Sequence, residues 1–236
     1  MGADRLDNPP GADPGDLKAE LYNLDATPYE SLMLGLFTIW HSSGRVAKQS
    51  KINDVGLGFS RDGFHWDRPF REAVLSVSNE ANTWNFGNVQ SVGGGCLVVG
   101  DRLYLYSSGR RANEWSTGLW FLRRDGFASM VSGERAGTLT TRHLRFSGRR
   151  LFVNLEAPRG GLQVEVLNRE GRVIAPFTKE ACTMVTGDRT QLEVRWGGAA
   201  DLGQLAGEPV HLRFHLKNGA LYSFWISPDA SGASHG

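Results

Sequence analysis

The stretch LGFSRDGFHW, residues 57–66, ends an apolar segment with an Asp-Gly pair, and the stretch WFLRRDGFAS, residues 120–129, does the same. The shared word RDGF thus recurs 63 residues later. Asp-Gly is a preferred pair for a tight turn between two strands, so we assign Asp62 and Asp125 to hairpin turns. A repeated unit of about 50–65 residues that ends in such a hairpin is typical of a β-propeller blade.

The composition supports a globular all-β chain. Gly accounts for 30 of the 236 residues and aromatic residues for 10%, which favours short strands joined by tight turns. Hydrophobic residues make up 40%, enough for a packed core. The 26 basic and 25 acidic residues give a formal net charge of +1, so we expect no nucleic-acid partner. No run reaches the ~18 apolar residues of a membrane span, so we expect no membrane partner either.

Apolar segments follow one another from Leu21 onward. Residues 1–20 contain Pro, Gly and Asp without an apolar period, and we interpret them as a linker or arm. Residues 21–136 predict two propeller-like blades. Their strands are expected at Ser31–Trp40, Asp54–Ser60, Gly95–Val99, Leu103–Ser107 and Gly118–Leu122.

From residue 137 the alternation of apolar and polar residues becomes regular. Strands separated by Gly-containing turns are typical of an antiparallel β-sandwich, which we place at residues 137–228. Residues 229–236 are expected to form a disordered tail. The predicted fold class is therefore all-β: a partial β-propeller of about two blades, followed by an antiparallel β-sandwich. The sandwich strands are expected at Leu144–Phe146, Leu151–Val153, Leu162–Leu167, Gln191–Trp196, Val210–Leu216 and Leu221–Ile226.

The order of these segments resembles a known family. YNLDATPYESLMLGLFTIW (22–40), WNFGNVQSVGGGCLVVGDRLYLYSSGR (84–110) and the two RDGF segments are similar to late blades of five-bladed propellers of the invertase, levanase and arabinanase clan of glycoside hydrolases. GTLTTRHLRFSGRRLFVNLEA (137–157) resembles the β-sandwich that follows such propellers. The resemblance implies a carbohydrate ligand in a propeller funnel. Five blades need roughly 300 residues, so we expect this chain to correspond to the C-terminal part of a longer protein.

Two carboxylates are candidates for catalysis. Glycoside hydrolysis needs two carboxyl groups ~5–9.5 Å apart across the scissile bond. Asp25 and Glu30 flank Pro28-Tyr29 at the entrance to the first apolar strand. The resemblance implies that Glu30 takes the place of an acid that precedes an inner strand, but it also implies a first-blade acid that has no counterpart here. The alternative is that both are structural or rim carboxylates.

Six further residues are interpreted from their hydrogen-bonding chemistry. Amides and an indole suit a sugar, because its hydroxyls need donors and acceptors and its C–H faces stack on Trp. An ordinary loop with local Asn turns and solvated surface charge are the alternatives. The candidate substrate-binding residues are His41, Trp84, Asn85, Asn88, Gln90 and Arg110.

Other chemistries find little support. Cys96 and Cys182 are too few for a disulfide framework and are expected to behave as small apolar residues. His211 and His215 lie on one face of a predicted strand, ~13 Å apart, too far for one metal ion. We therefore expect no metal and no cofactor. The preferred function is a glycosidase-like hydrolase fragment that acts on or binds carbohydrate; the alternative is a non-catalytic carbohydrate-binding or structural β-module.

Assembly and location follow from the same patterns. Two blades without neighbours would expose the flanks SLMLGLFTIW (31–40) and GCLVVGDRLYLY (95–106), so we expect a homo-oligomer that buries them. The N-terminus lacks the basic and apolar regions of a signal peptide. The cytoplasm is therefore the default location, and secretion is the alternative if a signal segment precedes Met1.

Overall fold

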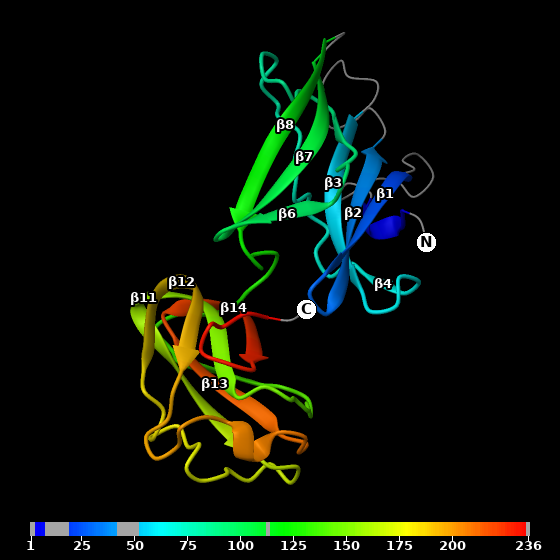
Figure 1. Cartoon of the computed structure of the whole chain (residues 1–236). Helices are drawn as coiled ribbons and strands as arrows, with labels where there is room; N and C mark the ends of the chain where they lie inside the picture. The colour runs from blue at the N-terminus through cyan, green and yellow to red at the C-terminus, as the bar shows by residue number, and fades with distance from the viewer. Residues whose placement is uncertain (1–2, 8–18, 42–51, 112–113, 235–236) are drawn as a thin grey trace. The chain divides into compact units, whose positions relative to one another are not determined.

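The computed structural model describes residues 3–7, 19–41, 52–111 and 114–234. The chain divides into two compact units, residues 1–122 and 123–235, which are described separately. Strands dominate both units, and the described residues contain two short 3₁₀ turns but no α-helix (Figure 1). The predicted all-β class is confirmed. No helix among the described residues is long and apolar enough to cross a membrane.

The first sheet of the first unit is an antiparallel meander in the order β1-β2-β3-β4. Glu30 and Ser31 form the two-residue turn between β1 and β2, and Glu30 adopts a left-handed backbone with φ of 50°. The first RDGF copy makes the expected hairpin, because β4 pairs directly with the end of β3. Asp62 closes it by accepting hydrogen bonds from the backbone N–H groups of Phe64 and His65. The strands are β1 (Glu20–Tyr29), β2 (Leu32–His41), β3 (Ile52–Ser60) and β4 (Trp66–Asp67).

The second sheet is built around β7 (Arg102–Arg111). On one side β7 pairs with β5 and then with β6, and on the other side it pairs with β8. The two sheets are the blade-like part of the fold. The partners of β7 are β5 (Val89–Gln90), β6 (Cys96–Val99) and β8 (Glu114–Arg123).

The second RDGF copy does not form a β-hairpin, and that expectation was wrong. Residues 124–127 make a turn, but the strand after it, β9 (Met130–Ser132), pairs with β14 of the second unit instead of β8. Among the described residues the second sheet therefore has no counterpart of β4. The second unit begins at Arg123, whereas the sequence places its start at residue 137.

The segment SLMLGLFTIW is not an exposed flank. Leu34, Leu36, Phe37 and Ile39 of β2 are at most 2% exposed. Gly35 and Gly58 lie against the rings of Trp66 and Phe37, and a Cβ at Gly35 would lie 2.4 Å from a Trp66 ring carbon. Glycine is needed at these positions of β2 and β3, because any side chain would collide with the rings that lie against the backbone.

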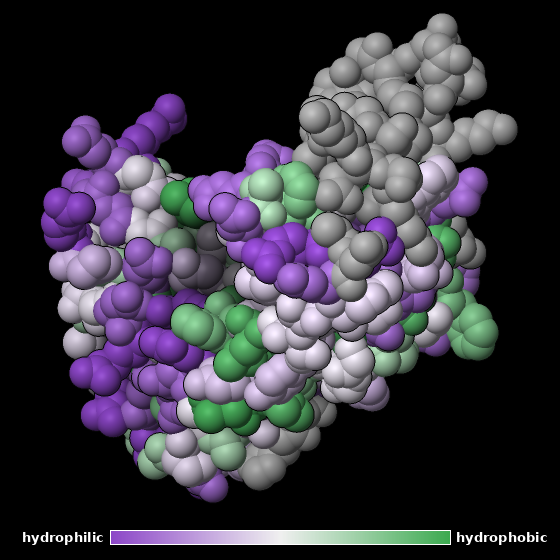
Figure 2. Space-filling model, turned by 90° about the horizontal axis from the view of Figure 1, so that it is seen from above, coloured by the Kyte–Doolittle hydropathy of each residue, from purple (hydrophilic) through white to green (hydrophobic). Residues whose placement is uncertain are grey.

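The other expected flank, residues 95–106, is divided between core and surface. Leu103 and Leu105 are buried, whereas the β6 residues Leu97, Val98 and Val99 are about half exposed. Figure 2 shows such apolar residues on the surface, in green, among purple hydrophilic ones.

Residues 3–7, part of the predicted linker or arm, are held against the first unit by a buried ion pair. Asp7 ends the 3₁₀ turn Arg5–Asp7 (η1) and is 5% exposed. Both oxygens of its carboxylate accept hydrogen bonds from Arg68, at 3.0 and 2.7 Å. The Arg68 guanidinium also lies over the Phe37 ring, 4.9 Å from its centroid. The segment therefore has a defined place on this unit.

The second unit is an antiparallel β-sandwich organised by one long strand, β11 (Arg150–Leu167). Its first part pairs with β12 and β14, and its second part pairs with β13. Through this change of partner, β11 connects the strands β12 and β14 with the strand β13. The other strands are β10 (Gly137–Thr140), β12 (Val185–Val194), β13 (His211–Lys217) and β14 (Gly219–Ser227), and the 3₁₀ turn Gly203–Leu205 (η2) precedes β13.

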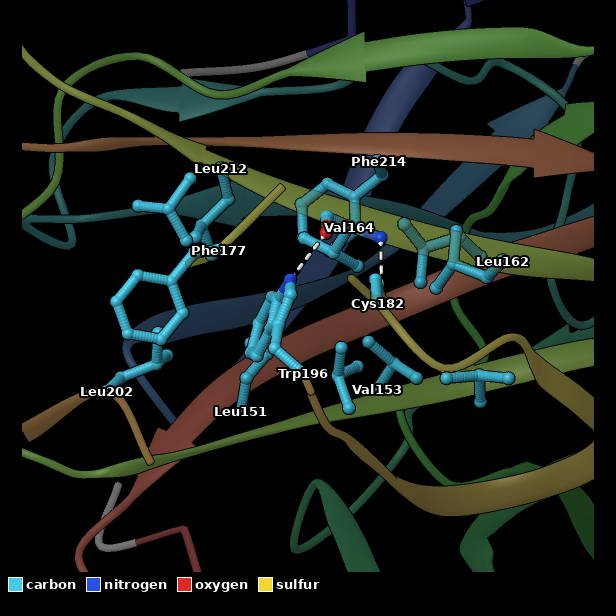
Figure 3. Close-up of a cluster of buried hydrophobic side chains, with 14 of the residues drawn as sticks. Leu151, Val153, Leu162, Val164, Phe177, Cys182, Trp196, Leu202, Leu212 and Phe214 are labelled. Atoms are coloured by element: carbon cyan, nitrogen blue, oxygen red, sulfur yellow. Dashed lines mark hydrogen bonds between the residues drawn. The ribbon is translucent and has the colours of Figure 1, made fainter. Parts of the chain in front are cut away.

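The core of this unit contains two hydrogen bonds among apolar side chains (Figure 3). The Trp196 indole N–H donates to the Val164 carbonyl at 2.8 Å, and the Val164 N–H donates to the Cys182 sulfur at 3.2 Å. Cys182 is 3% exposed, as a small apolar residue should be. Burial raises the pKa of its thiol, which keeps it protonated at neutral pH.

Candidate functional site

Polar side chains gather where the first sheet meets the segment around β5. We call this set, defined by Asn23, Asp25, Thr38, Asn53, Asn88, Gln90 and Ser91, the polar seam. Asn23 pairs with Thr38 across β1 and β2, and side chains alternate along a strand. Asn23, Asp25 and Thr38 therefore share one face. The structure thus brings together three predicted site residues: Asp25, Asn88 and Gln90.

Several hydrogen bonds connect the seam, among them that from Ser91 Oγ to Asn23 Oδ1 at 3.4 Å. Asn53 Nδ2 donates to Gln90 Oε1 at 2.9 Å, and the Ser91 backbone N–H donates to Thr38 Oγ1 at 3.1 Å. Asp25 Oδ2 accepts from the Val92 backbone N–H at 2.7 Å and from Asn23 Nδ2 at 2.8 Å. Asp25 is therefore a positioned acceptor that ties β1 to the residues after β5.

Asn53 is the most buried amide of the seam. It is 0% exposed, and its backbone forms a parallel bridge with Asn88, which is 4% exposed. Asn53 Oδ1 accepts no hydrogen bond from the described residues. A buried acceptor left unsatisfied costs about 1–3 kcal/mol. The position therefore favours a donor supplied from beyond the described residues, such as water or a ligand hydroxyl.

His41 lies on the opposite face of the same sheet. Its ring Nε2 is 2.8 Å from Asp54 Oδ1, and His41 and Asp54 are 5% and 7% exposed. In the neutral tautomer that donates from Nε2, Nδ1 is an acceptor, and it has no hydrogen-bond partner among the described residues. Asn53 and Asp54 are adjacent, so the His41 pair and the seam meet at the start of β3 while facing opposite ways.

The two catalytic candidates are not brought together. Asp25 lies within β1, whereas Glu30 is exposed in the turn after it. Five residues of extended chain span about 16 Å. Glycosidases need their carboxyl pair within about 9.5 Å. The backbone positions of Asp25 and Glu30 are therefore more widely spaced than the carboxyl groups of such a pair.

Trp84 and Asn85 have structural contacts. The Trp84 ring lies against the backbone of Gly109 and Gly118, where an added Cβ would come within 2.3 and 2.0 Å of it. It also meets Trp120 edge to face, with centroids 5.6 Å apart. Asn85 Nδ2 donates to the Ser76 carbonyl at 3.1 Å. These contacts favour the structural alternative for both residues.

Arg110 connects to the seam through its backbone only. Its N–H donates to the Asn88 carbonyl at 3.1 Å. Its guanidinium instead lies over the exposed Trp115 ring, with Cζ 5.4 Å from the centroid.

Sequence reasoning missed four residues of the seam and the partner of His41: Asn23, Thr38, Asn53, Ser91 and Asp54. A signal was present: the segment INDVGLGF (52–59) has two polar residues at the start of an otherwise apolar and glycine-rich strand. Buried polar residues of this kind need partners, which makes them candidates for a site.

The second unit has a small depression whose charged side chains are paired with one another. Arg149 contacts Asp201 at 2.8 Å, and Arg150 contacts Glu193 at 2.6 Å. Burial alone would raise the pKa of Glu193, but hydrogen bonds from Arg195 and Arg150 hold it below its ordinary value. Among the described residues, no group of three or more His, Cys, Asp and Glu side chains could hold a metal ion.

Comparison with known proteins gives distant similarities. No protein-family model and no curated protein matches the sequence. A candidate glycosidase from Bacteroides thetaiotaomicron VPI-5482 is similar in structure, with 13% identity and a TM-score of 0.37 over 66% of this chain and 52% of that one. A glycoside hydrolase family 43 arabinoxylan arabinofuranohydrolase from Bacillus subtilis, in complex with cellotetraose, has 9% identity and a TM-score of 0.26 over 87% of this chain and 53% of that one. This chain thus matches about half the length of each of these two structures.

Proposed function

We propose that this chain binds carbohydrate at the polar seam, without hydrolysing it. The observation that carries the proposal is Asn53 Oδ1, a fully buried amide oxygen that accepts no hydrogen bond from the described residues. A sugar hydroxyl can donate to such an atom, and the amides around it can donate and accept in turn.

The seam is accessible along part of its length. Asn23, Asp25, Gln90 and Ser91 are half-buried, in contrast to Asn53. These half-buried side chains offer donors and acceptors to a ligand at the rim of the seam, next to the buried amide.

Binding is favoured over catalysis by the positions of the carboxylates. The Cα atoms of Asp25 and Glu30 are about 16 Å apart by strand geometry, and Glu30 lies in the exposed turn after the strand that carries Asp25. Asp25 also accepts two hydrogen bonds, which position it as a fixed acceptor. In this proposal the chain descends from a glycosidase-like hydrolase, as the sequence suggests, and acts as a carbohydrate-binding module.

The test compares two amide replacements in the full chain. Asn53→Leu replaces the seam amide by an apolar side chain of the same branching, and Asn85→Leu makes the same change at an amide that donates to the Ser76 carbonyl, outside the seam. A glycan array selects the ligand, calorimetry measures its affinity, and thermal melts monitor folding. We expect Asn53→Leu to weaken binding about tenfold or more, and Asn85→Leu to leave it within about twofold. An array without binders, or a folded Asn53→Leu protein with unchanged affinity, would overturn the proposal.

A further inference from the structure

One face of the second sheet is exposed and rich in aromatic residues. Exposure alternates along β8: Trp115, Leu119 and Phe121 are 65, 46 and 58% exposed, whereas Gly118 between them is buried. Side chains at alternate positions share one face of a strand. We call this set, with the β7 residues Arg102, Tyr104 and Arg110, the outer aromatic face.

Arginines stack on the rings at both ends of this face. Arg110 Cζ lies 5.4 Å from the Trp115 centroid, and Arg102 Cζ lies 4.7 Å from the Phe121 centroid. Tyr104 adjoins Phe121, with ring centroids 6.2 Å apart. Trp115 and Phe121 are six residues apart on β8, which corresponds to about 20 Å. The face therefore repeats one arginine–aromatic motif over a distance that an oligosaccharide, rather than one sugar, would span.

The charged members of this face, Arg102 and Arg110, are both positive. Neither Arg102 nor Arg110 has an ion pair among the described residues, and the nearest acid on β8, Glu114, is paired with Arg111. The charged residues that share the outward side of β7 and β8 are arginines, and the exposed acids Asp101 and Glu114 lie beside the face, at the ends of these strands. A second copy of the same face would place arginine against arginine, so the face complements an anionic partner better than itself.

We propose that the outer aromatic face binds a linear acidic polysaccharide of the uronate class. Aromatic rings stack on the C–H faces of sugars, and a guanidinium already stacked on a ring can still bind a carboxylate with both of its outer nitrogens. Single-stranded nucleic acid offers rings and charge as well. The net charge of +1 and only two arginines on the face argue against it. None of these residues belongs to the polar seam, so this is a second site.

The experiment uses the full chain and two ligands with the same backbone: polygalacturonate oligomers and their methyl esters. We expect the acid to bind at least about tenfold more tightly than the ester, and added salt to weaken the binding of the acid. Arg110→Gln should reduce the preference for the acid. Trp115→Ala should weaken both ligands about tenfold, because the stacking surface is lost.

Matched controls lie on the same unit, outside the face. Phe64 is 84% exposed and Arg61 is exposed, so Phe64→Ala and Arg61→Gln remove a ring and a charge of the same kinds. We expect both to stay within about twofold of wild type.

Several outcomes would each overturn the proposal. They are no binding of the acid, equal affinity for acid and ester, equal effects of Trp115→Ala and Phe64→Ala, and full competition by a single-stranded oligothymidylate. A dimer that loses its association on Trp115→Ala would do so as well, because the face would then be occupied by a second copy.

Discussion

Replacing Asp7 by asparagine removes a negative charge from an ion pair that is almost wholly out of water. The side chains of Arg68 and Asp7 are only 5% and 2% exposed. Arg68 donates two hydrogen bonds to the carboxylate, and its Nε has no partner among the described residues. After Asp7→Asn the guanidinium therefore stays buried without its carboxylate, and Arg71, 3.4 Å from Asp7, adds a second positive charge nearby.

The expected cost is large for a single substitution. Breaking a buried ion pair on one side costs about 3–5 kcal/mol, because the remaining charge is uncompensated. A domain is stable by about 5–15 kcal/mol in total, so the first unit should lose a substantial part of its stability. Calorimetry on the full chain should show the transition of the first unit move down while that of the second unit stays in place.

A control and a double mutant sharpen the test. Glu170 and Arg172 form an exposed pair at 3.7 Å, so Glu170→Gln should cost at most about 0.5 kcal/mol. Asp7→Leu combined with Arg68→Met should be less destabilised than either single variant, because no buried charge is left. A cost of Asp7→Asn below about 1 kcal/mol, the range of a surface pair, would refute the reasoning.

Four further predictions can be checked separately. Burial alone would raise the pKa of Asp7, but hydrogen bonds from Arg68 hold it below its ordinary value of 3.8. The contribution of Asp7 to the stability of the first unit is therefore present above about pH 4 and is lost as the pH falls through the lowered pKa. Acid unfolding of wild type compared with Asp7→Asn measures this difference. Glu30→Gln should leave glycan affinity within about twofold, because Glu30 lies in an exposed turn; a larger loss by calorimetry would restore it as a site residue. The fragment 123–236 should melt cooperatively and at a higher temperature than 137–236, because Arg123 donates to Asn154 Oδ1 and to the Leu155 carbonyl; equal melting would contradict the boundary at Arg123. Self-association stays a prediction for the exposed β6 residues Leu97, Val98 and Val99, which lie outside the outer aromatic face; light scattering at micromolar concentration that returns only the monomer mass of 25.9 kDa would contradict it.

The two RDGF copies show how far local sequence predicts this fold. The first copy is followed by Trp66 and Asp67, which return to pair with β3, as Asp-Gly turns predict. The second copy has the same four residues, but Met130–Ser132 pair with β14, some 90 positions further along the chain. The four-residue word is the same, so the difference arises from a long-range partner that local patterns do not encode.

The candidate site was predictable only in part, for a related reason. Asp25, Asn88 and Gln90 were named from their chemistry, and their meeting depends on the register of β1, β2 and β3 and on the Asn53–Asn88 bridge. His41 fell on the opposite face because its position in β2 has the other parity from Thr38.

The structural role of Trp84 could have been predicted from two glycines on the strands that its ring contacts. Gly109 and Gly118 occupy inward positions of β7 and β8, and both leave room for its ring. Glycines at inward positions of two neighbouring strands indicate that a large side chain lies against the backbone.

The most direct test of binding at the polar seam is nuclear magnetic resonance of the side-chain amides during titration with the glycan that binds best on the array. The account predicts that the Asn53 side-chain amide shifts and saturates at the calorimetric affinity, because its oxygen gains a donor, while the Asn85 amide stays in place. A saturating glycan that shifts Asn85 or the sandwich, and leaves Asn53 unmoved, would contradict it.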